Sequence, residues 1–125
     1  MHEGFYKETK VAIKVMKFEQ LTEIEVRDFR REVGVLSRLD HKNIIKFHAA
    51  TTKAPNLTVV MEYVERGDFA AMLYQRQQKL PWKLRLSIAR DVAAGIAYLH
   101  SLNPKIIHRD IKASNVLVNS FLKRV

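Results

Sequence analysis

The segment His108–Asn115, His-Arg-Asp-Ile-Lys-Ala-Ser-Asn, constrains this chain more than any other feature of its sequence. It lies between two short apolar runs and contains an aspartate, a lysine and an asparagine, which are Asp110, Lys112 and Asn115. A single loop can bring three such polar side chains to one reacting centre. The alternative is a basic turn without chemistry. Five fixed identities at fixed offsets argue against that alternative.

The segment resembles the catalytic loop of protein kinases, His-Arg-Asp-x-Lys-x-x-Asn. In that family each of the three polar positions has a role in phosphoryl transfer. The resemblance implies that Asp110 accepts the proton of the attacking hydroxyl group. It implies that Lys112 neutralises charge on the transferred phosphoryl group and that Asn115 binds a metal ion through its amide oxygen.

A second motif, Val11-Ala12-Ile13-Lys14, resembles the third strand of kinases. There the lysine contacts the α- and β-phosphates of ATP and is held by a carboxylate on the next helix. Glu32 is the candidate carboxylate, because the stretch 29–45 resembles the kinase C-helix and the connection after it. Glu32 could instead be a surface charge paired with a neighbouring arginine. Phe29 and Val33 flank it on an apolar stripe, which favours an inward orientation.

The segment 62–68 resembles the hinge between kinase lobes, whose backbone binds adenine. The resemblance implies that Met61 guards the rear of the adenine pocket and that Glu62 and Val64 offer the hinge contacts. It implies that Asp68 meets the ribose hydroxyls. Asp68 could also cap a short helix over 69–73, and the cap is favoured if only one role holds. The implied nucleotide-binding residues are Ala12, Lys14, Met61, Glu62, Val64, Asp68 and Leu117.

Hydrophobic periodicity predicts the remaining elements. A period of two, with β-branched residues on one face, predicts strands, and a spacing of three and four predicts amphipathic helices. Pro81 is a start signal for a long helix, and 86–100 resembles the kinase E-helix. We expect two strands within 4–17, a helix from 22 or 23 to 38, strands over 44–51 and 57–62, helices over 69–73 and 81–100, and short strands at 106–107 and 116–118.

The resemblance implies an α+β, protein-kinase-like two-lobe fold that is truncated at both ends. We expect a partial N-lobe over 1–61, with an antiparallel sheet and the C-helix, and a hinge over 62–67. A partial helical C-lobe over 68–125 then ends after the catalytic loop. The Gly-x-Gly-x-x-Gly motif expected before Val11 and the Asp-Phe-Gly motif expected after Asn115 do not occur in the 125 residues. We therefore expect this chain alone to be inactive.

Composition sets further limits on location and partners. The chain has no cysteine, which fits an intracellular, cytoplasmic protein, including the cytosolic side of a receptor-like kinase. No apolar stretch approaches the length of a membrane span. The net charge is +9, but the basic residues are scattered along the chain, so we do not expect nucleic-acid binding.

Lys112 favours serine/threonine over tyrosine specificity, because tyrosine kinases have Ala-Ala-Arg or Arg-Ala-Ala at this point of the loop. The string as a whole is most similar to the tyrosine-kinase-like group. The resemblance implies a kinase that uses ATP and Mg²⁺ to phosphorylate serine or threonine in protein substrates. The alternative is a non-catalytic, kinase-derived binding module or pseudokinase-like fragment. The sequence leaves the oligomeric state open.

Overall fold

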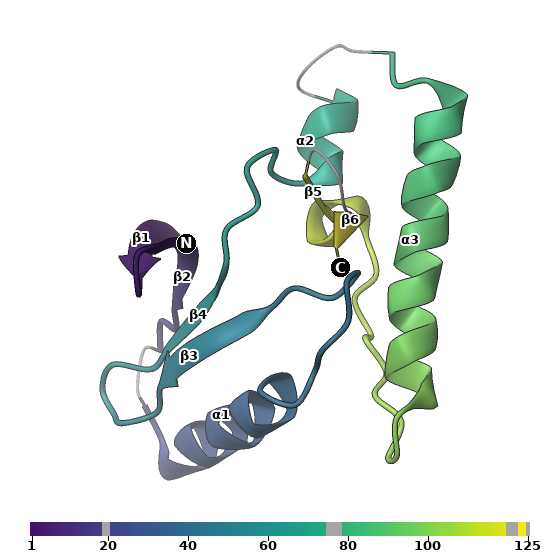
Figure 1. The fold of residues 1–125 in the computed structure, drawn as a ribbon. Helices are drawn as coiled ribbons and strands as arrows, with labels where there is room; N and C mark the ends of the chain where they lie inside the picture. The colour runs from purple at the N-terminus through teal and green to yellow at the C-terminus, as the bar shows by residue number, and fades with distance from the viewer. Residues whose placement is uncertain (19–20, 75–78, 120–122, 125) are drawn as a thin grey trace. The chain divides into compact units, whose positions relative to one another are not determined.

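A computed structural model of the chain describes residues 1–18, 21–74, 79–119 and 123–124 (Figure 1). The fold is α+β, as expected, with a four-stranded antiparallel sheet and helices. It divides into two compact units, residues 1–40 with 46–63 and residues 41–45 with 64–125. The elements in chain order are β1 (His2–Tyr6), β2 (Thr9–Val15), α1 (Glu23–Leu36), β3 (Phe47–Thr51), β4 (Thr58–Glu62), α2 (Phe69–Tyr74), α3 (Trp82–Ser101), the 3-10 helix η1 (Ala113–Asn115), β5 (Leu117–Val118) and β6 (Lys123–Arg124).

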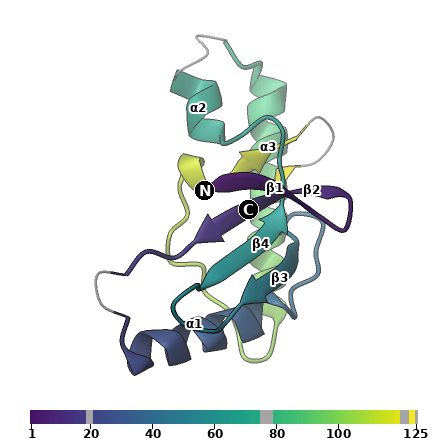
Figure 2. The same cartoon turned by 90° about the vertical axis from the view of Figure 1, so that its left-hand side faces the viewer.

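The sheet of the first unit has the strand order β1-β2-β4-β3, and every pair is antiparallel (Figure 2). Strands β1 and β2 form a hairpin through Lys7 and Glu8, both of which have positive φ angles. Val11 in β2 is completely buried and Ile13 is half-buried, as the alternation of apolar residues predicts, whereas Val15 at the end of the same face is exposed. β2 then pairs with β4, which places Lys14 opposite Val59 in the ladder.

Helix α1 begins with a capping box. The Thr22 side chain accepts the backbone N–H of Glu25, and the Glu25 carboxylate accepts the backbone N–H of Thr22. Phe29 is the buried residue of the helix and joins Leu57 and Val59 in the core of this unit. The predicted apolar stripe therefore faces the sheet, because half-buried Val26 and Val33 pack against the same cluster.

The second unit has its core between α2, α3 and the strand that leaves the loop of residues 108–115. The buried residues of this core are Met72, Leu80, Ile88, Val116 and Val118. The segment 41–45 also belongs to this unit. The His41 ring stacks on Tyr98 of α3 with 4.9 Å between centroids, and Asn43 is buried beside Gly95.

Four predicted boundaries need correction. The strand expected from Ile44 begins at Phe47, because Ile44 is turned back by a hydrogen bond from its N–H to the His41 carbonyl. The strand expected at residues 106–107 is absent from the described residues, and the Ile106 N–H instead bonds the Leu99 carbonyl of α3. α1 ends at Leu36, two residues early, and β1 begins at His2, two residues before the expected range. No helix within the described ranges has the length and hydropathy needed to cross a membrane.

Candidate functional site

Three side chains of the loop in the second unit meet at one carboxylate. The Lys112 ammonium lies 3.1 Å from Asp110 Oδ2. Asn115 Nδ2 donates to the same oxygen at 2.9 Å and to the Asp110 backbone carbonyl at 2.8 Å. The spacing of two and five residues therefore brings a carboxylate, an ammonium group and an amide into direct contact.

The backbone of this loop explains why the three groups converge. Arg109, just before Asp110, has a φ of 66°, a left-handed conformation that is unusual for a residue with a side chain. The Asp110 N–H then donates to His108 Nδ1 at 3.2 Å. The Asn115 N–H donates to the Lys112 carbonyl at 2.9 Å, which closes the turn of η1. The sequence identified these residues but gave no signal for the strained Arg109 backbone or the His108 acceptor.

The Asp110 carboxyl group is tuned by its neighbours. Lys112 first, and Asn115 second, hold the pKa of Asp110 below its ordinary value, because both donate to the ionised form. The Asp110 and Lys112 side chains are 62% and 56% exposed. The carboxylate is therefore ionised at neutral pH and accessible to solvent.

Two further candidate residues of this unit lie opposite each other. Asp68 and Leu117 form an antiparallel bridge, which is flanked by a bond from Phe69 N–H to the Val116 carbonyl and one from Val118 N–H to the Gly67 carbonyl. Gly67 has a φ of 72°, a conformation that glycine adopts without strain.

The Asp68 side chain caps the short helix α2. Its Oδ1 accepts the backbone N–H of Ala71 at 2.8 Å, so the predicted cap is confirmed. This bond occupies one carboxylate oxygen and leaves the second as a candidate contact for a ribose hydroxyl.

Three candidate residues of the first unit lie on paired strands. Ala12 of β2 and Met61 of β4 are register partners, and Met61 packs against the core of the unit. Glu62, next to Met61, donates its backbone N–H to the Lys46 carbonyl, and its carboxylate accepts the Lys46 N–H. The sheet thus fixes Ala12, Met61 and Glu62 at neighbouring positions. Val64 belongs to the second unit and is buried.

Lys14 and Glu32 are not joined in this structure. Both side chains are exposed, and among the described residues no ion pair links them. The expected inward orientation of Glu32 is therefore not seen. Its helix directs Phe29 into the core, and a carboxylate without a nearby cation is more stable in water than in an apolar interior. The pairing of Lys14 with Glu32 stays a prediction.

Asn115, the residue expected to hold Mg²⁺, offers a suitable ligand atom, but it is a single ligand. Asn115 donates through Nδ2, so its amide oxygen is the atom available to a cation, and Mg²⁺ prefers oxygen ligands. In the described part of the chain there is no cluster of three or more His, Cys, Asp or Glu residues. Such an ion would take most of its ligands from phosphate and water, which is common for Mg²⁺.

Comparison with known proteins identifies relatives along almost the whole chain. The sequence model of the family described as protein tyrosine and serine/threonine kinase matches residues 1–124. Serine/threonine-protein kinase CTR1 of Arabidopsis thaliana is 40% identical over 121 residues, 95% of this chain and 15% of that protein. A probable serine/threonine-protein kinase of Dictyostelium discoideum, drkD, is 40% identical over 93% of this chain and 9% of its own length. The dual specificity protein kinase shkA of the same organism is 39% identical over 90% of this chain and 21% of that protein. The chain thus spans less than a quarter of each of these relatives.

Proposed function

Since the chain belongs to the protein tyrosine and serine/threonine kinase family, we propose that it contributes the catalytic loop to a serine/threonine protein kinase. The reaction is transfer of the ATP γ-phosphoryl group to a serine or threonine hydroxyl of a protein substrate. The observation that supports this most directly is the contact of Lys112 and Asn115 with one oxygen of Asp110.

In this proposal Asp110 is the base. Its lowered pKa keeps the carboxylate ionised, so it can orient the substrate hydroxyl and accept its proton as the oxygen–phosphorus bond forms. Lys112 lies beside the carboxylate and can neutralise the negative charge that spreads over the phosphoryl oxygens. Asn115 would hold Mg²⁺ through its amide oxygen, and that ion supplies charge neutralisation on the phosphates when bound.

The nucleotide would be held by the other candidate residues. Ala12 and Leu117 are apolar, and each suits one face of an adenine ring. Met61 would close the rear of the adenine site, and the backbone groups of Glu62 and Val64 would bond its edge.

The phosphates and the ribose would be held by charged side chains. Lys14 would contact the α- and β-phosphates and take Glu32 as its partner once α1 brings that carboxylate inward. Asp68 would use the oxygen that does not cap α2 to bond a ribose hydroxyl.

Radiolabelled phosphate transfer tests this proposal in a longer protein that contains the chain with its Gly-rich and Asp-Phe-Gly flanks. We expect Mg²⁺-dependent labelling of serine or threonine, identified by phosphoamino-acid analysis. Asp110→Asn should lower the rate by about 10²- to 10⁴-fold, the usual contribution of a general base. Asp28→Asn, which removes an exposed carboxylate of α1, is the matched control and should leave the rate unchanged.

The alternative is a non-catalytic binding module, and the same assay separates the two. Labelling that persists in Asp110→Asn, or that is confined to tyrosine, would refute the proposal. Nucleotide binding without any transfer would favour the module. A polypeptide of only these 125 residues should show no transfer, because it contains neither the phosphate-covering glycines nor the metal-binding aspartate of the family.

A further inference from the structure

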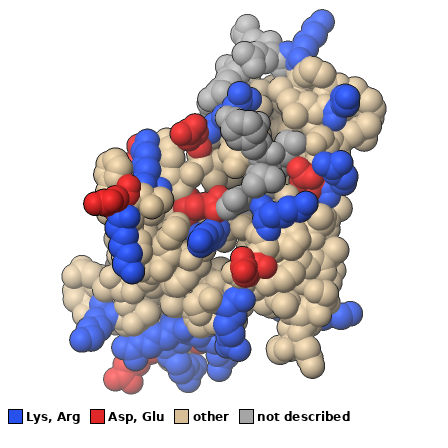
Figure 3. Space-filling view, in the orientation of Figure 1, with Lys and Arg blue, Asp and Glu red and all other residues tan. Residues whose placement is uncertain are grey.

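Three arginines of α1 share one exposed face of the helix, and a fourth joins them just past its end. At 3.6 residues per turn, Arg27, Arg30 and Arg31 fall within an arc of roughly 100°. All three are exposed, and the Arg27 side chain is 70% accessible. Arg38 follows the last turn and donates from Nε to the Gly34 carbonyl at 3.0 Å, which draws it to the same face. Blue side chains gather over α1 in Figure 3. We call Arg27, Arg30, Arg31 and Arg38 the arginine face.

The arginine face is partly pre-organised for anions. Arg30 Nε donates to the Thr52 carbonyl at 3.2 Å, and Arg38 Nε is held by Gly34. Each guanidinium therefore keeps its two terminal nitrogens for a bidentate contact with an acidic group. Gly34 lies in the middle of the face, and a Cβ added there would meet no atom within 4 Å. The space above Gly34 is therefore open and lies between the charged side chains of the arginine face.

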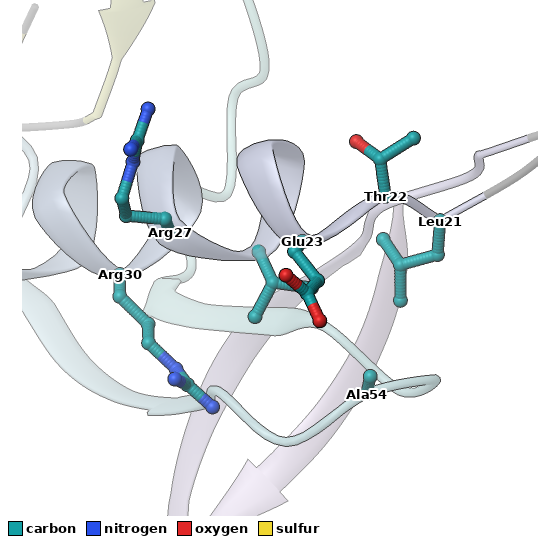
Figure 4. A pocket seen from close by; sticks show the side chains of 7 residues that line it. Leu21, Thr22, Glu23, Arg27, Arg30 and Ala54 are labelled. Atoms are coloured by element: carbon teal, nitrogen blue, oxygen red, sulfur yellow. The ribbon is translucent and has the colours of Figure 1, made fainter.

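A pocket lies at the N-terminal end of this face (Figure 4). Its volume is about 490 Å³. The apolar lining comes from Leu21, Val26 and Ala54, while the side chains of Arg27 and Arg30 also line it. The pocket and the arginine face therefore form one continuous surface, because two of the arginines belong to both.

We propose that this surface is a docking site for an acidic linear segment of a partner protein, anchored by one apolar side chain in the pocket. From Arg27 to its end at Leu36 the helix rises about 14 Å, which an extended peptide covers with about four residues. A segment of about eight residues would then reach the pocket as well. This inference does not depend on the proposed kinase activity.

The charges around the site set the direction of such a segment. Glu23 lines the pocket, so the anchor end should be apolar and uncharged, with the acidic residues over the arginines that follow. Asp28 lies 3.7 Å from Arg27, but both groups are exposed and such a pair is weak. Glu25 is engaged in the capping box, and at 3.6 residues per turn it falls on the opposite side of the helix from the arginine face.

Two other anionic partners fit the surface less well than a peptide. Single-stranded nucleic acid needs aromatic rings on which bases stack, and the arginine face and pocket have none. A lipid surface needs a broad apolar helix face, whereas Ile24 is the one large exposed apolar side chain of α1. A recessed apolar pocket beside arginines instead suits one side chain of an acidic peptide.

Fluorescence anisotropy tests the proposal with the 125-residue chain. The probes are two labelled acidic peptides of about eight residues, one with a leucine at its N-terminus and the other with a leucine at its C-terminus. Each has a matched peptide in which serine replaces the leucine. We expect one leucine peptide to bind with an affinity that falls as salt rises. The leucine-to-serine change should weaken its binding about tenfold, the effect of leaving one leucine unburied.

Substitutions in the chain localise the site. Arg27→Gln/Arg31→Gln/Arg38→Gln should weaken binding about tenfold or more, since three exposed charge contacts are lost. The matched control is Lys79→Gln/Lys83→Gln/Lys105→Gln, which removes the same charge from exposed lysines elsewhere and should leave binding within about twofold. Circular dichroism checks that both variants keep the helical content of the parent chain.

Four results would overturn the proposal. These are no binding by either leucine peptide, equal binding by the serine peptides, an equal loss in the lysine control, and tighter binding to single-stranded DNA or anionic vesicles than to the peptide. The last result would assign the arginine face to a different partner class.

Discussion

Gly95 in the middle of α3 is the position where a single added methyl group should be most informative. A Cβ on Gly95 would lie 3.0 Å from the Asn43 carbonyl oxygen, 3.3 Å from Ile44 Cδ1 and 3.4 Å from Asn43 Cβ. Alanine should favour the helix by about 1 kcal/mol over glycine. Overpacking a well-packed site costs about 1–3 kcal/mol. We therefore expect Gly95→Ala to lower the free energy of unfolding by up to about 2 kcal/mol.

The crowded neighbours have little freedom to move. The Asn43 N–H donates to His41 Nδ1 at 3.0 Å, and the Ile44 N–H donates to the His41 carbonyl at 3.0 Å. His41 is itself stacked on Tyr98 of α3. The backbone oxygen facing Gly95 is therefore held from two sides. Only the terminal carbon of Ile44 can yield at low cost.

Urea unfolding followed by circular dichroism measures the effect, and two variants of the same unit serve as controls. Ala93→Gly changes an exposed position of α3 and should cost about 1 kcal/mol from helix propensity alone. Ile44→Val removes Cδ1 and should partly relieve the loss in Gly95→Ala, which a double-mutant cycle would detect as coupling. If Gly95→Ala stabilised the chain by as much as Ala93→Gly destabilised it, the steric reasoning would be wrong.

Three further predictions concern single side chains. Lys112→Met in the active longer protein should move the acid limb of the pH–rate profile to higher pH. Lys112 lowers the pKa of Asp110, so its loss raises that pKa, and activity falls as pH drops through it. An acid limb that does not move would exclude this coupling. Asp68→Ala should destabilise α2 by about 1 kcal/mol and speed hydrogen exchange at the Ala71 amide, whereas Asp68→Asn should preserve both. Thr22→Ala should cost about 1 kcal/mol in urea unfolding, and Thr22→Ser should cost much less because it keeps the capping hydroxyl.

The fold could be predicted from sequence wherever a local pattern determines it. The apolar stripe of α1 is encoded within a few turns of the helix, and it is present. The start of β3 could not be predicted, because apolar Ile44 and Ile45 suit a strand as well as a packed turn. Packing against α3 decides between the two, and no local pattern contains that information.

The candidate site likewise has one part that a local sequence pattern predicts and another part that it does not. Asp110, Lys112 and Asn115 lie within six residues of each other, so the loop itself brings them together. The bridge between Asp68 and Leu117 joins residues far apart in sequence, and no local spacing could indicate it. The family resemblance pointed to both residues through their expected nucleotide contacts, and gave no hint of the bridge.

The unpaired state of Lys14 and Glu32 follows from where their partners are. The ion pair would join a strand to a helix, so its formation depends on how α1 is rotated and positioned over the sheet. The apolar cluster around Phe29 fixes one rotation of α1, in which Glu32 remains in water. An exposed ion pair contributes at most about 1 kcal/mol, whereas burying Phe29 contributes about 1.5–3 kcal/mol. Packing of Phe29 therefore outweighs an exposed ion pair in setting the rotation of α1.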